Sequence, residues 1–312
     1  MNFWNNKKIL VTGGAGFLGS FIVDNLTEKR RVSNENIKIP RSLHADLRKW
    51  ENCVKIVKDI DVVIHLAGKG GGIGYNRKNP GSLFYDNIVM NTHLIEAARQ
   101  EGVEKLVGIG TVCSYPKYAK VPFKEEDLWD GYPEETNAAY GLSKKMMLVQ
   151  SQAYWQQYGF NSIHLLLVNL YGPRDNFDLE SSHVIPALVR KFVEAAKNRQ
   201  NQVMVWGTGK ASREFLYVED AAEVIILAAE KYNKPEPINV GSGKEITIHD
   251  LVSLIAELTN YKGKIVWDTS KPDGQPRRCL DTSKAKKEFG FEARTDFREG
   301  LRRTISWYEQ NY

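Results

Sequence analysis

Four side chains in this sequence have types and positions suited to proton transfer. Thr111 and Cys113 follow directly after the apolar segment 104–110, within the stretch GIGTVCSYPK. Tyr140 and Lys144 stand four residues apart in AAYGLSKK, so on a helix they lie one turn apart on the same face. An ammonium close to a phenol stabilises the phenolate and lowers the tyrosine pKa, which is about 10 when unperturbed. The Tyr140–Lys144 pair is therefore predicted to exchange a proton with a substrate oxygen.

A glycine-rich segment near the N-terminus predicts a dinucleotide site. The segment TGGAGFLG lies between the apolar run 7–14 and a stretch with helical periodicity. Glycines at this spacing let the backbone approach a pyrophosphate, while the helix N-terminus supplies N–H donors and a positive dipole. The residues expected at this contact are Gly13, Gly16, Phe17, Leu18 and Gly19.

The segment NIKIPRSLHADL, the second predicted strand and its end, bears on the choice between NAD and NADP. An acidic residue at the end of this strand would bind a ribose 2′-OH and select NAD. This chain has Arg41 and Ser42 there instead, and a guanidinium can bind a 2′-phosphate with two hydrogen bonds. We therefore expect NADP(H), with Asp46 and Leu47 at the edge of the adenine. The alternative interpretation of Arg41 is a solvated loop residue.

Apolar segments alternate with helix-like segments along the chain, and this alternation indicates the fold class. The apolar runs are 7–14, 61–68, 104–110 and 161–172, and the long helix-like segments are 81–101 and 138–158. Strands that are apolar throughout indicate a parallel sheet covered on both faces. We predict an α/β fold, a Rossmann-type doubly wound parallel sheet with a smaller C-terminal α/β substrate lobe. The expected NADP-binding domain comprises 1–172 plus about 214–241, and the expected substrate lobe comprises 173–213 and 242–312.

Composition narrows the possible partners. The 312 residues are 42% hydrophobic and 26% charged, an ordinary globular composition. The net charge of +5 is spread along the chain without a polybasic block, so nucleic acid is a poor candidate partner. No apolar segment is long enough to span a bilayer, and we expect a cytoplasmic protein. The cysteines, Cys53, Cys113 and Cys279, lack CxxC spacing, so we expect free thiols and no metal site.

Together these motifs resemble the extended short-chain dehydrogenase/reductase family. The shared pattern is TGxxGxxG at 12–19, a hydroxyl residue, Thr111, after the fourth strand, and YxxxK at 140–144. Within that family the chain is similar to the GDP-L-fucose synthases over nearly its whole length. The stretches that carry this closer similarity are CSYPK (113–117), NLYGPRDNF (169–177), SSHVIPALVRK (181–191), VWGTGKASREFLYVED (205–220) and SKPDGQPRR (270–278).

The resemblance implies a reaction in two stages on a GDP-linked keto sugar. GDP-4-keto-6-deoxy-D-mannose would be epimerised at C3 and C5 and then reduced at C4 with NADPH, giving GDP-L-fucose. Cys113 and His183 match the acid/base pair of the epimerisation, and both residue types exchange protons near neutral pH. Thr111 and Tyr140 would hold the oxyanion at C4. Tyr140 would also donate the proton during reduction, and Lys144 would orient the nicotinamide ribose and lower the tyrosine pKa.

The resemblance also implies substrate contacts and a dimer. The residues that match sugar or diphosphate contacts of the family are Lys191, Trp206, Arg213 and Arg278. Asn169 and the loop 69–76 are expected to line the same cleft, and Asn169 is also expected to contact the cofactor. Cations at such positions pair with the diphosphate charge. Relatives dimerise through two long helices that form a four-helix bundle, here about 81–101 and 138–158, so we expect a homodimer.

Departures from the family pattern leave alternatives open. Thr111 stands where the family usually has serine, and Val112 replaces a small hydroxyl residue. A related GDP-6-deoxy-heptose therefore remains an alternative substrate, because a pocket discriminates such sugars through few contacts. A nucleotide-sugar 4-epimerase or dehydratase that retains NAD would need neither Cys113 nor His183. A reductase that has lost epimerisation is expected only if Cys113 or His183 lies outside the active site. A dinucleotide-binding sensor typically lacks the Tyr/Lys pair.

Overall fold

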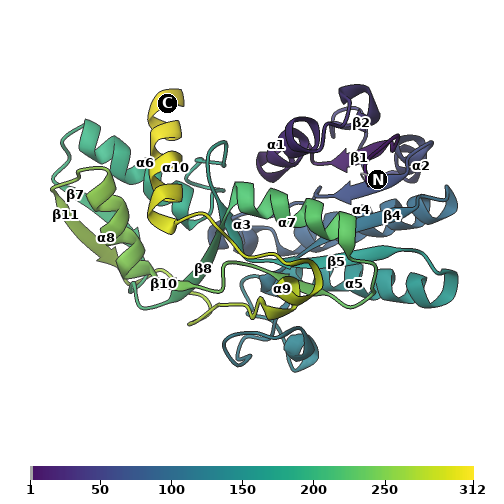
Figure 1. Cartoon of the computed structure of the whole chain (residues 1–312). Coiled ribbons are helices and arrows are strands. Elements are labelled where there is room, and N and C mark those ends of the chain that lie inside the picture. The colour runs from purple at the N-terminus through teal and green to yellow at the C-terminus, as the bar shows by residue number, and fades with distance from the viewer. Residues whose placement is uncertain (1–2) are drawn as a thin grey trace.

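A six-stranded parallel sheet organises the larger lobe of the computed structural model, which describes residues 3–312 and is shown in Figure 1. In their order across the sheet, the strands are β2 (Ile37–Lys38), β1 (Ile9–Thr12), β3 (Val62–His65), β4 (Lys105–Thr111), β5 (Ser162–Leu167) and β9 (Ile238–Val240). Each neighbouring pair is parallel. Strand order reverses next to β1, as in a Rossmann-type fold, so the prediction of a doubly wound parallel sheet is confirmed.

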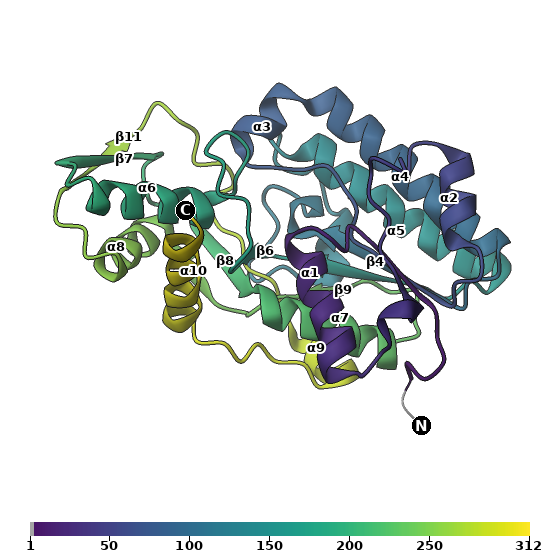
Figure 2. The ribbon, with the colours of Figure 1, turned by 90° about the horizontal axis from the view of Figure 1, so that it is seen from above.

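Helices cover both faces of this sheet, as Figure 2 shows. The helices are α1 (Phe17–Asp24), extended by the π-helical turn η1 (Asn25–Lys29), and α7 (Val218–Lys231) on one face, and α2 (Trp50–Val57), α4 (Pro80–Gln100) and α5 (Ala138–Tyr158) on the other. Successive residues of β1 alternate between two apolar clusters: Ile9 and Val11 join the cluster under α1 and α7, and Leu10 joins the cluster under α2 and α4. Burial on both faces explains why these strands are apolar throughout.

The smaller lobe lies beside the larger one, at the left of Figure 1. Its strands are β6 (Asn169–Tyr171), β8 (Ser212–Tyr217) and β10 (Glu245–Thr247) in one sheet and β7 (Gln202–Trp206) and β11 (Lys264–Asp268) in another, and its helices are α6 (Val184–Lys197), α8 (Ile248–Leu258) and α10 (Phe297–Asn311). The remaining helices are α3 (Ile73–Lys78), α9 (Ser283–Phe289) and the 3₁₀ helices η2 (Asn34–Asn36), η3 (Val112–Ser114) and η4 (Glu125–Trp129). A separate apolar cluster joins α6, α8 and α10.

The chain passes between the lobes more than once. After β9, the chain builds β10, α8 and β11 in the smaller lobe and then returns to the larger lobe. Leu280 and Phe291, which the sequence assigns to the smaller lobe, pack in the apolar cluster of the Rossmann sheet. The backbone N–H of Phe123 donates to Cys279 O at 2.8 Å, and that of Asp281 donates to Phe123 O at 2.8 Å. The segment before α9 is thereby fixed against the larger lobe.

A buried carboxylate also ties this returning segment to the smaller sheet. Glu214 on β8 is fully buried and accepts hydrogen bonds from the backbone N–H of Leu280 at 2.7 Å and of Gly243 at 2.6 Å. Burial raises the pKa of this carboxyl group, while the backbone donors act in the opposite direction. Because one side chain holds two segments, their arrangement around β8 is fixed.

Three local features differ from the expected elements. The apolar run 161–172 is two strands, because the chain leaves the large sheet after Leu167 and β6 pairs with β8 instead. The second strand, β2, has only two residues. Strand β11 was not predicted, since KIVWD is a short run in a polar stretch.

No helix among residues 3–312 is long and apolar enough to cross a membrane, and that part of the chain holds no His, Cys, Asp and Glu cluster suited to a metal ion.

Candidate active site

A cavity of about 430 Å³ opens between the two lobes, at the carboxyl ends of β4 and β5. Ligands bind at this edge of open α/β sheets, where helices and loops follow the strands. The cavity brings together most residues predicted to act on the substrate, namely Thr111, Cys113, Tyr140, Asn169, His183, Lys191, Trp206, Arg213 and Arg278. Phe17 and Leu18, from the start of α1, reach the same cavity, so the glycine loop and the predicted catalytic residues face one space.

The first turn of α5 is packed directly on the segment that carries Cys113. A Cβ atom at Gly141 would lie 2.2 Å from the carbonyl oxygen of Cys113, so only glycine allows this approach. Ser114 Oγ donates a hydrogen bond to Gly141 O at 2.9 Å. The contact places Tyr140, the neighbour of Gly141, beside Cys113 at the cavity wall.

Thr111 orders the turn that presents the thiol. Thr111 is the last residue of β4, and its Oγ1 accepts a hydrogen bond from the backbone N–H of Cys113 at 3.2 Å, which caps the 3₁₀ helix η3. A hydroxyl can accept and donate at the same time, so its hydrogen remains available to a ligand oxygen in the cavity. Serine would serve equally.

Lys144 lies behind Tyr140, away from the cavity lining. Its side chain is buried next to Gly68, where a Cβ atom would lie 3.2 Å from Nζ, and burial lowers the pKa of Lys144 to about 8. The expected lowering of the Tyr140 pKa is not found. Burial raises the pKa of Tyr140, and the neighbouring Cys113 raises it further. Loss of water around the phenol therefore sets the direction of the shift, and no effect of Lys144 on the Tyr140 pKa is seen.

The loop 69–76 covers the pair and contacts the segment before His183. Gly70 lies over the Tyr140 ring, where a Cβ atom would be 3.3 Å from Cε2. The backbone N–H of Gly72 donates to Ser181 O at 3.1 Å, and a Cβ atom at Gly72 would lie 2.4 Å from Ser182 O. The glycines of KGGG are therefore required for close packing at the cavity mouth.

His183 directly precedes α6 and is its N-cap residue, although its side chain forms no capping hydrogen bond. Its accessible surface faces the cavity. The pKa of His183 lies below its ordinary value, first because the surrounding protein displaces water and second because Arg278 lies nearby. His183 and Cys113 thus line one cavity, from different lobes.

Cations line the wall of the smaller lobe. Arg213 is buried and donates to the carbonyl oxygens of Ser212, Gln275 and Asp273. Burial, and after it the nearby Arg278, lower the pKa of Arg213 to about 9. Lys191 donates to Met204 O and lies over the Trp206 ring at 5.8 Å, and burial lowers its pKa. No carboxylate of residues 3–312 lies within 4 Å of these three cations, so their charge is available to an anion.

The glycine loop fits a pyrophosphate. Gly13 has φ +73°, and a Cβ atom there would lie 3.0 Å from the backbone nitrogen of Ala67. A Cβ atom at Gly19 would lie 2.1 Å from Gly13 O, so α1 packs tightly on the loop. No side chain caps the N-terminus of α1 at Gly16, and its first N–H groups remain available to a phosphate.

The residues after β2 only partly match the adenosine site expected there. Arg41 is exposed in a turn. Leu47 is buried in the apolar cluster under α2, so its side chain contributes to packing. Asp46 forms a 2.7 Å ion pair with Arg48, which lowers the pKa of Asp46 to about 2, and Arg48 also contacts Asp86 at 3.0 Å. Sequence reasoning missed Arg48, a second guanidinium close to the expected 2′-phosphate position, although its place two residues after Asp46 was a usable signal.

The family of the chain follows from a comparison with known proteins. The model of the NAD dependent epimerase/dehydratase family matches residues 9–241. The chain belongs to this family. Within the family, it is 39% identical over 308 residues to a protein from Oryza sativa named probable GDP-L-fucose synthase 1, covering 97% of this chain and 92% of that protein. The predicted resemblance to GDP-L-fucose synthases is therefore confirmed.

Solved structures of family members have the same architecture. A GDP-6-OMe-4-keto-L-xylo-heptose reductase from Campylobacter jejuni superimposes with a TM-score of 0.93 at 28% identity, with all of both chains covered. A GDP-L-fucose synthetase from Naegleria fowleri bound to NADP gives a TM-score of 0.87 at 29% identity, with 100% of this chain and 97% of that chain covered. The similarity extends over both lobes of this epimerase/dehydratase family member.

We predict that Gly141→Ala destabilises the protein. The added methyl group would overlap Cys113 O, and relief requires α5 or η3 to move, so we expect the free energy of unfolding to fall by about 1–3 kcal/mol. Urea unfolding measures this change. Gly81→Ala is the control, because a Cβ atom at that position in α4 meets nothing within 4 Å. A Gly141→Ala protein as stable as the wild type would contradict the close approach of α5 to the Cys113 carbonyl oxygen.

Proposed function

We propose that this chain converts GDP-4-keto-6-deoxy-D-mannose to GDP-L-fucose, by epimerisation at C3 and C5 and reduction at C4 with NADPH as the cofactor. The observation that carries the proposal is one cavity between the lobes that holds Cys113, Tyr140 and His183 next to the glycine loop. The relatives named above as GDP-L-fucose synthases match nearly the whole chain, which supports the same conclusion.

The proposed epimerisation uses Cys113 and His183 as a proton donor and acceptor. The ketone at C4 acidifies the hydrogens at C3 and C5, so a base removes each one and leaves an enolate. The hydroxyl of Thr111 and the phenol of Tyr140 stabilise the negative oxygen of this enolate by hydrogen bonding. Because Cys113 and His183 come from different lobes, one can remove a proton from one face of the sugar while the other returns a proton to the opposite face.

In the proposed reduction Tyr140 is the proton donor. NADPH supplies a hydride to C4 when it is bound. The raised pKa of Tyr140 keeps the phenol protonated at neutral pH, which suits a residue that gives its proton to the C4 oxygen. Lys144, the glycines of residues 13–19 and Asn169 are proposed to bind the cofactor, together with Arg41, Asp46 and the backbone at Leu47. These assignments follow from position and chemistry.

We propose that the cations of the smaller lobe bind the diphosphate of the GDP group. Lys191, Arg213 and Arg278 line the cavity opposite the catalytic residues. Their charges lack carboxylate partners in the described chain, so a dianion would compensate them. Trp206, with 51% of its surface exposed, offers a flat apolar face at the same wall. On this division, residues 1–172 with about 214–241 hold NADPH, and residues 173–213 and 242–312 hold the nucleotide sugar.

A GDP-linked 6-deoxy-heptose is the second candidate substrate. The heptose reductase from Campylobacter jejuni has the higher TM-score of the two structures compared above, and it supports this alternative. Thr111, in place of the usual serine, lies where it could shift the sugar. A 4-epimerase that retains NAD is disfavoured, because it has no need of Cys113 and His183 in one cavity.

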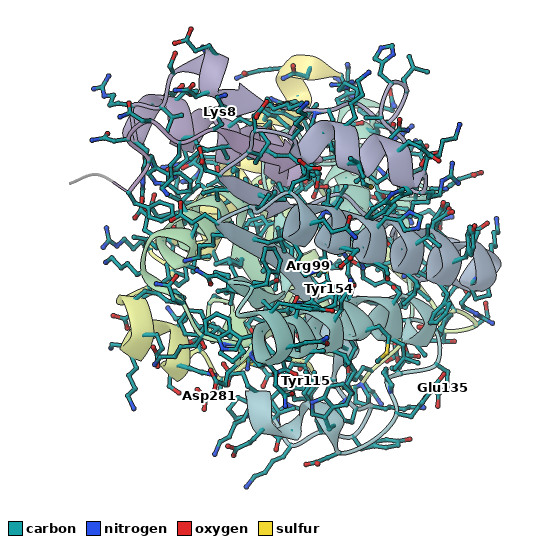
Figure 3. The ribbon with its side chains drawn as sticks, turned by 90° about the vertical axis from the view of Figure 1, so that its right-hand side faces the viewer. Lys8, Arg99, Tyr115, Glu135, Tyr154 and Asp281 are labelled. Carbon is teal, nitrogen blue, oxygen red and sulfur yellow. The ribbon has the colours of Figure 1, made fainter. Side chains whose placement is uncertain are left out.

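A homodimer through α4 and α5 is also proposed, in a cytoplasmic protein. The two helices pack on each other, and Figure 3 shows Arg99 of α4 next to Tyr154 of α5, where the guanidinium lies 5.8 Å from the ring centroid. Their outer faces expose large apolar side chains, including Phe84, Met146 and Val149. An exposed apolar surface of this kind supports self-association.

The function is tested by incubating the protein with GDP-4-keto-6-deoxy-D-mannose in D₂O, with and without NADPH, and recording NMR spectra of the sugar. We expect deuterium at C3 and C5 in both samples and GDP-L-fucose only with NADPH. Cys113→Ser and His183→Gln should each slow the exchange by about 10²–10⁴-fold, whereas the control Cys53→Ala, in α2, should not. Reduction without exchange would refute the acid/base assignment, and turnover of a GDP-6-deoxy-heptose alone would favour the second candidate.

We predict that kcat/KM for NADPH falls as pH rises through about 8, the pKa of Lys144 in this structure. Lysine is charged below its pKa, so the ammonium that is proposed to orient the cofactor is present on the acidic side and lost on the alkaline side. Lys144→Arg keeps a charge to much higher pH and should remove this decline. An unchanged alkaline limb in Lys144→Arg would show that another group causes it.

We predict that Val149→Asp converts the dimer to a monomer, because a carboxylate on each of two facing α5 helices would lose its hydration and repel the other. Light scattering after size-exclusion chromatography measures the mass. The control is Tyr132→Asp, at an exposed loop residue outside α4 and α5. A monomeric wild-type protein would refute the dimer.

A further inference from the structure

The loop 69–76 reaches from the larger lobe to the smaller one at the cavity. Ile73 and Gly74 line the cavity and lie next to the smaller lobe. A Cβ atom at Gly74 would lie 3.8 Å from the Trp206 ring, and one at Gly274 would lie 3.2 Å from Ile73 Cδ1. Because the loop lies against both lobes, its position sets the shape of the space in which the nucleotide sugar is proposed to bind.

The first residue of the loop is anchored on α4. Asn87 Oδ1 accepts a hydrogen bond from the backbone N–H of Lys69 at 2.9 Å, and Asn87 Nδ2 donates to Lys69 O at 2.8 Å. The Lys69 ammonium also pairs with Asp86, a buried carboxylate on the same helix. This end of the loop is thus held through both its backbone and its side chain.

The last residue of the loop is anchored at the start of α5 by a chain of three buried side chains. Asn76 Nδ2 donates to Asn137 Oδ1 at 2.9 Å, and Asn137 Nδ2 donates to Glu134 Oε2 at 2.9 Å. Asn76, Asn137 and Glu134 are 4%, 8% and 6% exposed, so water does not readily replace a lost partner. Since Asn137 directly precedes α5, these hydrogen bonds join the loop to the helix that carries Tyr140.

Glu134 fixes the direction of this chain of hydrogen bonds. A carboxylate accepts hydrogen bonds and donates none, and Glu134 also accepts from the backbone N–H and the hydroxyl of Thr136. Asn137 therefore turns its NH₂ group toward Glu134 and its oxygen toward Asn76, which must present its own NH₂ group. The side-chain oxygen of Asn76 has no partner among residues 3–312. The Asn76 side chain is thus held by one hydrogen bond, whose direction Glu134 determines.

The next residue along the chain, Glu135, provides an internal comparison. Its side chain is 67% exposed and pairs with Lys117 at 2.9 Å. The two adjacent glutamates therefore differ in burial and in partners, although both carry the same charge. Glu134 also acts electrostatically on Arg213, where it opposes the lowering of the Arg213 pKa. A test of Glu134 must therefore separate its hydrogen bonds from its charge.

We propose that Glu134 is a positioning residue that, through Asn137 and Asn76, holds the loop 69–76 in the place that the nucleotide sugar requires. This inference rests on the proposed function. Asn76 and Asn137 line the cavity, whereas Glu134 is not among the described residues that line it. Glu134 therefore orders the binding site without contacting the sugar. Without the carboxylate, a buried amide group would be left unpaired and the end of the loop released.

Reversal of the Asn137 amide tests this proposal. In Asn76→Asp, the new carboxylate faces the oxygen of Asn137, so the hydrogen bond to the loop is lost. When Glu134→Gln is added, the Asn137 amide can turn over. Its NH₂ group then donates to the new carboxylate, and its oxygen accepts from the new amide at position 134. We therefore expect Glu134→Gln to restore the loop in Asn76→Asp.

Hydrogen–deuterium exchange, followed by mass spectrometry without any ligand, measures how firmly the loop is held in the wild type, both single variants and the double variant. The relevant peptide contains the Gly72 amide, which donates to Ser181 O. We expect this peptide to exchange about tenfold faster in Asn76→Asp, because a buried hydrogen bond is lost, and at near the wild-type rate in the double variant.

Titration with GDP-mannose, a stable analogue of the proposed substrate, measures the effect of the loop on binding. The Kd for GDP-mannose should rise about tenfold in Asn76→Asp and return toward the wild-type value in the double variant. The Kd for NADP⁺ should stay unchanged in each protein, which shows that the fold is intact.

Two control variants separate hydrogen bonding from charge. Asn76→Leu removes the amide without adding a charge, so it should loosen the loop, and Glu134→Gln should not restore it. Glu135→Gln removes a charge one residue away, and it should not restore the loop in Asn76→Asp.

An unchanged exchange rate of the loop in Asn76→Asp would overturn the proposal, as would effects of Asn76→Asp and Glu134→Gln that simply add. A loosened loop with an unchanged Kd for GDP-mannose would also overturn it, because the loop would then have no part in placing the sugar. A wild-type protein that binds no GDP-mannose would instead refute the proposed function. The exchange rates would still decide whether Glu134 holds the loop, because they are measured without any sugar.

Discussion

Buried positive charge with no carboxylate within ion-pair distance among residues 3–312 is the constraint around which the cavity is built. Arg213 donates to backbone carbonyls, and Arg278 donates to an amide oxygen and a sulfur, but no carboxylate of residues 3–312 lies within 4 Å of either guanidinium. In a cavity from which water is partly excluded, such charges act more strongly than on the surface. In the proposed function, this positive wall of the smaller lobe attracts the diphosphate of the nucleotide sugar. The opposite wall holds Thr111, Cys113 and Tyr140, the groups proposed to carry the chemistry.

Close contacts fix the segments that form the walls of the cavity. Gly141 allows α5 to touch the turn at Cys113, and Gly19 allows α1 to touch the glycine loop. Glu214 holds the segment that follows Arg278 against β8. The thiol of Cys113, the phenol of Tyr140 and the guanidinium of Arg278 thus come from three parts of the sequence. A larger side chain at Gly141 would prevent the first contact, and an uncharged one at Glu214 would weaken the contact with the segment after Arg278. A site of this kind is rigid where it binds and reacts.

Much of the fold was predictable because the strands of the large sheet are buried on both faces. Strand β4 and helix α5 lie close to the expected ranges, and the glycine pattern located the turn before α1. The division of 161–172 into β5 and β6 was not predictable, since both strands are apolar and only tertiary pairing separates them. In the site, Cys113 and His183 were predicted through family motifs, and the structure brings both to one cavity. Gln275 was missed, because an isolated glutamine in a loop gives no signal that its amide will donate to Pro116 O and Lys117 O. The pKa of Tyr140 was misjudged, because spacing reveals a neighbouring charge but not the loss of water.

The return of the chain to the larger lobe has a consequence for protein synthesis. The apolar cluster of the Rossmann sheet contains Leu280 and Phe291, and Arg278 reaches the cavity from the same returning segment. A ribosome makes the chain from its N-terminus, so more than nine-tenths of the 312 residues must be translated before this core and the cavity wall can be completed. The nascent Rossmann half thus leaves the ribosome with part of its core uncovered. Completion of the cavity coincides with the end of translation, so an incomplete chain has no active site.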